Sequence, residues 1–83
     1  MNLIELGERI KAARRSKGWS QTKLAQAAGI SRARLEALEN ARLAEIGFKN
    51  LLRILNALDL DFRLTQFNRG RPTLEDLTAE EVR

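Results

Sequence analysis

The chain has 83 residues, of which 43% are hydrophobic and 31% are charged, so it suffices for one small domain with a modest core. Its 15 basic and 11 acidic residues give a net charge of +4, but residues 1–67 hold 12 basic and 7 acidic residues, whereas residues 68–83 hold 3 and 4. A basic body with a slightly acidic end fits a polyanionic partner, although an ordinary soluble protein can have the same balance.

Several classes of protein are excluded by residues that the chain lacks. It has no cysteine and no histidine, so it offers no disulfide scaffold and no thiolate site, and zinc would find only carboxylates. Since it also has no phosphate-cradling glycine loop, we expect no metal, no cofactor and no enzymatic activity. No stretch has the length of a signal peptide or approaches the ~20 apolar residues of a membrane span. We therefore expect a cytoplasmic protein without a membrane partner.

The first predicted helix lies near the N-terminus. Apolar residues recur there at three- and four-residue spacing, which describes one face of an amphipathic helix: Leu3, Leu6, Ile10 and Ala13. Gly18 is expected to stop this helix. Trp19 follows as the single tryptophan of the chain. Because it lies between two predicted helices, we expect it in the core rather than stacked on a nucleic-acid base.

Residues 21–40, QTKLAQAAGISRARLEALEN, have the spacing of two short helices that pack at a steep angle. Ser20 can cap the first of them, which covers residues 21–28, and Ser31 can open the second, which runs to about residue 40. Ala25 is small where the two helices meet, and Gly29 falls at the turn, where a left-handed backbone is needed. Further apolar positions close the core between the helices: Leu24, Ala28, Ile30, Leu35 and Leu38. In register, these features predict a helix-turn-helix of the kind that enters DNA.

A fourth predicted helix starts near Gly47 and ends near Asp59. Its apolar residues are again periodic: Phe48, Leu51, Leu52, Leu55 and Leu58. Residues 60–66 then alternate strictly between apolar and polar, which is typical of a half-buried strand. No other strand is apparent.

A lone strand leaves its backbone donors and acceptors unpaired. We therefore predict that two copies pair these strands about a two-fold axis. The predicted interface consists of Leu58, Leu60, Phe62 and Leu64. The alternative is that residues 60–66 simply extend along the helices. Beyond Phe67 the composition turns polar, and Gly70 and Pro72 discourage regular structure. We predict a DNA-binding and dimerisation domain over residues 1–67 and a flexible tail over residues 68–83 that can order on a partner.

Residues 6–60 resemble the phage-repressor Cro-like (XRE-type) helix-turn-helix domains, and residues 46–61, IGFKNLLRILNALDLD, look like HipB-type antitoxins. The resemblance implies an all-α, lambda-repressor-like domain of four or five helices, with the recognition helix third and one C-terminal strand that pairs between subunits. It further implies a dimeric transcriptional repressor that binds a palindromic operator in double-stranded DNA, regulates its own operon and binds a kinase-like toxin. A stand-alone regulator without a toxin is the alternative. A third reading, a protein-binding scaffold, is disfavoured by the basic residues of the helix-turn-helix.

The resemblance also implies roles for individual residues. Gln21 matches a residue that clamps a phosphate at a helix N-terminus. Helical spacing independently predicts that residues 32, 33, 36 and 37 face outward. The Arg32 guanidinium can donate hydrogen bonds to the two acceptors on the major-groove edge of guanine. Arg34 can reach either a base or a phosphate. The expected DNA-binding set is Gln21, Lys23, Ser31, Arg32, Ala33, Arg34, Ala37, Asn40 and Arg42. The expected structural set is the pair Arg14 and Glu39, which ties the first helix to the third, with Ala25 and Gly29.

The sequence departs from the family pattern at several positions. Ala33 and Ala37 have no hydrogen-bonding side chains, although their methyl groups can touch a thymine methyl. Glu36 on the outer face would repel phosphate and could help only by accepting a hydrogen bond from cytosine. Ala41 stands where relatives often have glycine, and a left-handed alanine there would cost ~1 kcal/mol. We therefore leave the exit of the third helix and the placement of Arg42 open.

Overall fold

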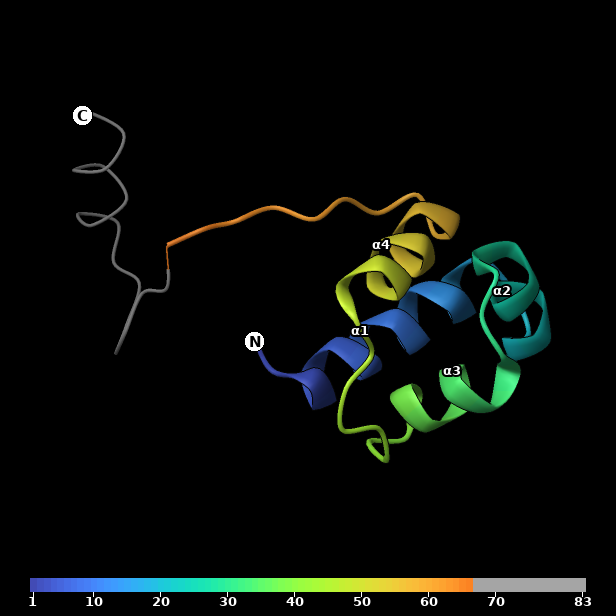
Figure 1. Ribbon diagram of the computed structural model, residues 1–83. Coiled ribbons are helices and arrows are strands. Elements are labelled where there is room, and N and C mark those ends of the chain that lie inside the picture. Colours follow the sequence, from blue (N-terminus) through green and yellow to red (C-terminus); the bar gives the residue numbers. More distant parts are fainter. Residues whose placement is uncertain (67–83) are drawn as a thin grey trace.

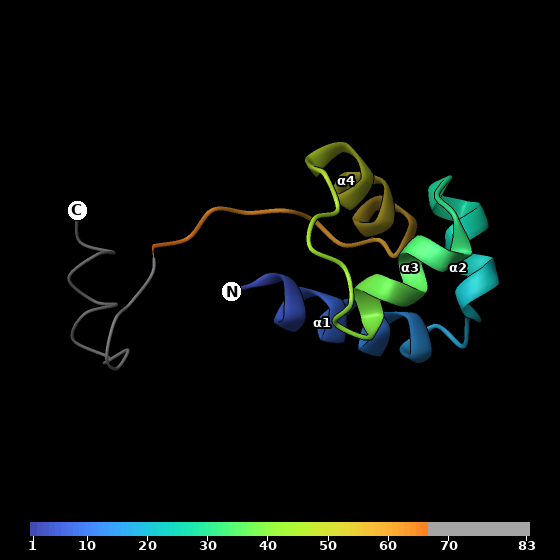
Figure 2. The ribbon, with the colours of Figure 1, turned by 60° about the horizontal axis from the view of Figure 1, so that its bottom comes forward.

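The computed structural model describes residues 1–66. This part of the chain forms four helices, which are α1 (Leu3–Ser16), α2 (Gln21–Ala28), α3 (Arg32–Glu39) and α4 (Phe48–Ala57). Figure 1 shows α2 and α3 joined by a short turn beside α1, and Figure 2 shows α4 above α1. The predicted four-helix fold is confirmed. No helix in residues 1–66 has the length and apolar character needed to cross a membrane.

Side chains and a left-handed glycine set the ends of the helices. The Asn2, Ser20 and Ser31 side chains each accept a hydrogen bond from the backbone N–H three residues later, which satisfies one orphan donor of α1, α2 and α3. Gly29 ends α2 with φ of 72°. The N–H of Ile30 then bonds back to the carbonyl of Ala25 at 3.0 Å. Because of this tight reversal, only three residues separate the end of α2 from the start of α3.

One hydrophobic cluster joins the four helices. Its fully buried members come from every helix and are Ile10, Leu24, Leu35, Leu38 and Ile54. Trp19 packs against this cluster and is half-buried. Leu58 also belongs to the cluster and is only 4% exposed. Its own chain therefore already covers most of this side chain, and a place for Leu58 at a dimer interface stays a prediction.

Gly7 is the point at which α1 touches α3. A Cβ atom at this position would collide with the backbone carbonyl of Leu38. The two helices therefore approach each other closely enough that only a hydrogen atom fits between them. Gly7 is buried in the middle of α1, where a glycine otherwise weakens a helix.

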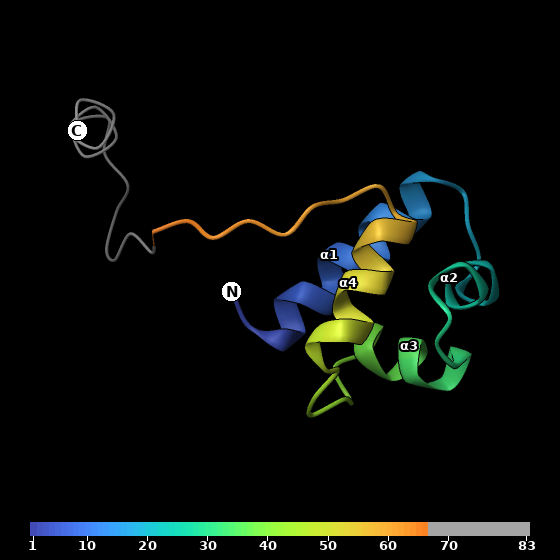
Figure 3. The same ribbon diagram turned by 45° about the horizontal axis from the view of Figure 1, so that its top comes forward.

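Residues 60–66 leave α4 as an extended segment that runs away from the helical body (Figures 1 and 3). Within the described residues this segment has no strand to pair with. Its main anchor is Phe62, whose ring meets the ring of Phe48 edge-on, with centroids 5.3 Å apart and planes at 86°. Strand pairing between two copies stays a prediction. The proposed tail, residues 68–83, lies outside the described residues.

Candidate nucleic-acid interface

The outer face of α3 is formed by residues 32, 33, 36 and 37, as helical spacing predicts. Arg32 and Ala33 are exposed at its first turn, and Ala37 is half-buried one turn later. Leu35 and Leu38 are buried on the opposite side, with 0% and 1% exposed. The small side chains at positions 33 and 37 make this face shallow, so that another surface can approach the backbone of α3 closely.

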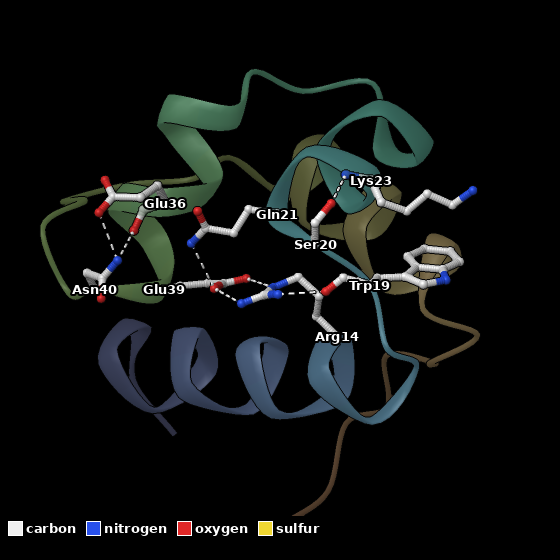
Figure 4. Close-up of polar contacts among 8 residues, drawn as sticks. All are labelled: Arg14, Trp19, Ser20, Gln21, Lys23, Glu36, Glu39 and Asn40. Carbon is white, nitrogen blue, oxygen red and sulfur yellow. Dashed lines mark hydrogen bonds and ion pairs between the residues drawn. The ribbon is translucent and has the colours of Figure 1, made fainter.

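The start of α2 lies beside this face. Ser20 caps α2, and the Gln21 amide follows it at the first helical position. The Nε2 of Gln21 donates to Oε1 of Glu39 over 3.2 Å, which orients the amide along the end of α3 (Figure 4). An amide has two N–H donors, so this contact leaves a second one for a ligand.

Trp19 forms a platform next to the start of α2. The Lys17 ammonium lies 5.0 Å from its ring centroid, and the Lys23 ammonium lies 5.5 Å from it. Both distances are within the range of cation–π attraction. The Lys17 ammonium also pairs with Oδ2 of Asp59 at 2.8 Å, so Trp19 chiefly supports the positive charge of Lys23 beside the Gln21 end of α2. Its half-buried position allows this role, which the sequence did not predict.

Arg14 and Glu39 form a buried ion pair behind this surface. Nε of Arg14 donates to Oε2 of Glu39 at 2.8 Å, and Nη2 of Arg14 donates to Oε1 of Glu39 at 2.9 Å. A third bond runs from Arg14 to the carbonyl of Trp19 at 2.7 Å (Figure 4). The hydrogen bond to Glu39 raises the pKa of the Arg14 guanidinium above its ordinary value, against the effect of burial. The network fixes α1, the start of α2 and the end of α3 relative to one another.

A second polar cluster lies where α3 ends. The Asn40 amide donates to Oε2 of Glu36 at 2.9 Å, and Arg42 donates to the other carboxylate oxygen. Ala41 has φ of 60°, so the chain leaves α3 through a left-handed alanine. This conformation brings the N–H of Arg42 to the carbonyl of Ala37 at 2.8 Å. The exit that the sequence left open therefore places Arg42 against Glu36.

Arg34 has a structural contact as well. Its guanidinium donates to the carbonyl of Glu45 at 3.3 Å and so links α3 to the loop before α4. The backbone N–H of the same residue is the one capped by Ser31. Both side chains remain exposed, and neither contact blocks the outer face.

The predicted DNA-binding residues and the predicted interface residues of the extended segment lie in different parts of the molecule. The expected DNA-binding residues gather on α3, the start of α2 and the loop after α3, whereas Leu60, Phe62 and Leu64 lie on the extended segment and are 42%, 43% and 88% exposed. Leu58 is separate from both groups. In residues 1–66 no group of three or more acidic, histidine or cysteine side chains is placed to hold a metal ion.

Comparisons with known proteins agree with this geometry. The helix-turn-helix family model matches residues 10–64. Two solved structures, described as "MDT Protein" and "Structure of HipA-HipB-O2-O3 complex", each superpose with a TM-score of 0.72 at 26% sequence identity, over 82% of this chain and 94% of the other. No curated protein matches the chain. The fold, the exposed face of α3 and the family match together establish that the chain belongs to the helix-turn-helix family of DNA-binding regulators.

Proposed function

We propose that this protein is a dimeric transcriptional repressor that reads a palindromic operator and acts as the antitoxin of a HipBA-like pair. The observation that supports DNA reading most strongly is the shallow outer face of α3, which carries exposed Arg32 and lies beside the start of α2. A helix of this kind fits the major groove, while the neighbouring helix N-terminus meets the phosphate backbone.

Each side chain of this surface has a distinct role in the proposal. Arg32 reads guanine through its planar guanidinium, while the Ala33 and Ala37 methyl groups contact base edges. The free N–H of Gln21 and the α2 N-terminus bind one phosphate, and Lys23 adds a positive charge nearby. The remaining proposed DNA contacts come from Ser31, Asn40, Arg42 and Arg34, and Arg34 can reach either a base or a phosphate.

The proposed dimerisation is supported by the exposed apolar side chains of the extended segment. Leu60, Phe62 and Leu64 lie at alternating positions, and a second copy that paired with this segment would cover them. Two recognition helices related by a two-fold axis would then meet half-sites about 34–36 Å apart. The operator would share that symmetry.

The antitoxin role is supported by the likeness to a solved assembly that contains HipA and HipB. In this proposal the chain binds a kinase-like toxin and represses the operon that encodes both proteins. The alternative is a stand-alone regulator with the same DNA chemistry. Purified protein can be titrated with the product of the neighbouring reading frame. Saturable binding at equal stoichiometry supports the antitoxin, and no binding at micromolar concentration leaves the stand-alone regulator.

The DNA-reading part of the proposal is tested by comparing Arg32→Ala with Lys23→Ala on an operator selected from random duplexes. Arg32→Ala should cost about 1–3 kcal/mol at one base position per half-site and relax the preference there. Lys23→Ala should weaken binding to every sequence alike and reduce the salt slope by roughly 1. Equal losses on selected and random DNA for Arg32→Ala would show that Arg32 does not read a base.

A further inference from the structure

Glu36 is a carboxylate placed on the surface that should meet the polyanion. It lies one helical turn after Arg32, and its side chain is 34% exposed. Left alone, such a carboxylate would repel phosphate groups over several ångströms. Its presence on the outer face of α3 therefore needs a reason.

Two donors hold this carboxylate in one position. Asn40 donates to Oε2 of Glu36 at 2.9 Å and also to the Glu36 backbone carbonyl at 2.9 Å. Arg42 donates to Oε1. The hydrogen bond from Arg42 lowers the pKa of the Glu36 carboxyl below its ordinary value, and Asn40 and the charge of Arg32 act in the same direction. The group stays ionised and can only accept hydrogen bonds.

The same contacts reduce the repulsion from DNA. Arg42 brings a positive charge onto the carboxylate, so the pair is neutral when seen from a distance. A carboxylate has about four lone-pair positions, and two of them are occupied by Asn40 and Arg42. In residues 1–66 no other donor reaches the remaining positions. The side chain is already held in place, which lowers the entropy lost when it binds.

The chemistry of the major groove then selects one base for this group. Cytosine presents only the donor of its N4 amino group there, whereas guanine presents two acceptors and thymine an acceptor and a methyl group. Adenine has an amino donor but sets the N7 acceptor beside it, which an ionised carboxylate cannot satisfy. The short side chains of Ala33 and Ala37 flank Glu36 and leave the base edge within its reach.

We propose that Glu36 is a second base-reading residue, which selects cytosine, and that Asn40 and Arg42 are positioning residues for it. This inference rests on the proposed DNA-reading function. Arg32 and Glu36 are four residues apart on α3, about 6 Å along the helix axis. The selected cytosine should therefore lie one or two base pairs from the guanine read by Arg32.

The test is selection of binding sites from a randomised duplex library by the intact protein and by two variants at position 36. The wild-type protein should enrich cytosine at one position per half-site beside the guanine. Glu36→Ala should reduce that preference about fivefold or more while the guanine preference remains. Glu36→Gln should move the preference from cytosine to adenine, because an amide matches both the N6 donor and the N7 acceptor.

Three controls make the outcome decisive. N4-methylcytosine in the operator should weaken wild-type binding, because the methyl group replaces the major-groove N–H, and should leave Glu36→Ala unaffected. Arg42→Ala should reduce the enrichment of cytosine relative to the other bases at the selected position, and Arg42→Lys should restore part of that enrichment. Circular dichroism should show the same thermal unfolding for Glu36→Ala as for the wild type.

Other results would overturn the inference. If Glu36→Ala tightens binding to all sequences alike, Glu36 is only a repulsive group. If the wild type and Glu36→Ala enrich the same cytosine, another side chain reads it. A wild-type protein that enriches no sequence at all would overturn the proposed function as well, so the two failures are distinguishable.

Discussion

Among single residues, Gly7 and Ala41 show how the absence or presence of a Cβ atom affects the backbone. Gly7 allows α1 and α3 to touch, because a Cβ there would meet the Leu38 carbonyl. Ala41 does the reverse, since it keeps a Cβ although its φ is 60°. One position requires glycine and the other would be more stable with it.

Gly7→Ala should lower the free energy of unfolding by about 1–3 kcal/mol, because the added methyl group must push two backbones apart. Gly18→Ala is the matched control. Its φ of 72° makes alanine strained, but nothing lies within 4 Å of the added Cβ, so the loss should be only about 1 kcal/mol. Urea unfolding of both variants measures the difference. A smaller loss for Gly7→Ala than for Gly18→Ala would contradict the close contact.

Ala41→Gly should raise the free energy of unfolding by about 0.5–1 kcal/mol, since glycine adopts the left-handed conformation without a steric penalty. Ala27→Gly is the control, because Ala27 is exposed within α2 and glycine costs up to about 1 kcal/mol in a helix. Both substitutions replace alanine with glycine. Ala41→Gly should raise the midpoint temperature of thermal unfolding, whereas Ala27→Gly should lower it. A destabilised Ala41→Gly variant would mean that Ala41 is not left-handed in solution.

At the scale of elements, the arrangement of α1, α2 and α3 depends on one buried ion pair. The side chains of Arg14 and Glu39 are 9% and 0% exposed, and three bonds from Arg14 reach α3 and the loop before α2. Gln21 joins the same carboxylate. The proposed phosphate clamp is therefore held by the network that orients the helices.

Glu39→Gln should lower the free energy of unfolding by about 3 kcal/mol, because it leaves the Arg14 charge buried without a counter-ion. The exposed pair of Glu5 and Arg9, with 3.3 Å between nitrogen and oxygen, provides the control. Glu5→Gln should change the free energy of unfolding by less than about 0.5 kcal/mol. Urea denaturation compares the two variants, and similar small effects would show that the buried pair does not stabilise the fold.

At the scale of the whole molecule, the exposed apolar side chains lie away from the outer face of α3. Leu60, Phe62 and Leu64 extend beyond the helical body, and Phe62 contacts Phe48, which is itself 59% exposed. Such side chains are unfavourable in water unless a partner covers them. The proposed dimer places them between two copies and leaves both recognition helices free.

Phe62→Asp should convert the dimer to a monomer, since burying one Phe side chain is worth about 1.5–3 kcal/mol and the dimer contains it twice. Thr65→Asp introduces the same charge on the opposite face of the extended segment and should leave the dimer intact. Sedimentation measures the state of association, and circular dichroism should show folded helices in both variants. Operator affinity should fall by orders of magnitude with Phe62→Asp alone. A dimeric Phe62→Asp protein would place the interface elsewhere, on α4.

The local features of this protein could be predicted from its amino-acid sequence. The spacing of apolar residues and the caps at Ser20 and Ser31 predicted α2 and α3 closely, because both signals act within one or two helical turns. The turn at Gly29 was predictable for the same reason. Together they sufficed to identify the helix-turn-helix and the outer face of α3.

Contacts between groups that are distant in the sequence could not be predicted in this way. Periodicity marked Leu58 as apolar but could not distinguish the core of one chain from an interface between two. Nothing local distinguished Gly7 from an ordinary helical glycine, since the obstacle belongs to Leu38, far along the chain. Likewise, Glu36 looked unfavourable for DNA binding until the left-handed Ala41 brought Arg42 back onto it. Spacing within a segment is a property of sequence, whereas contact between segments depends on how the whole core packs.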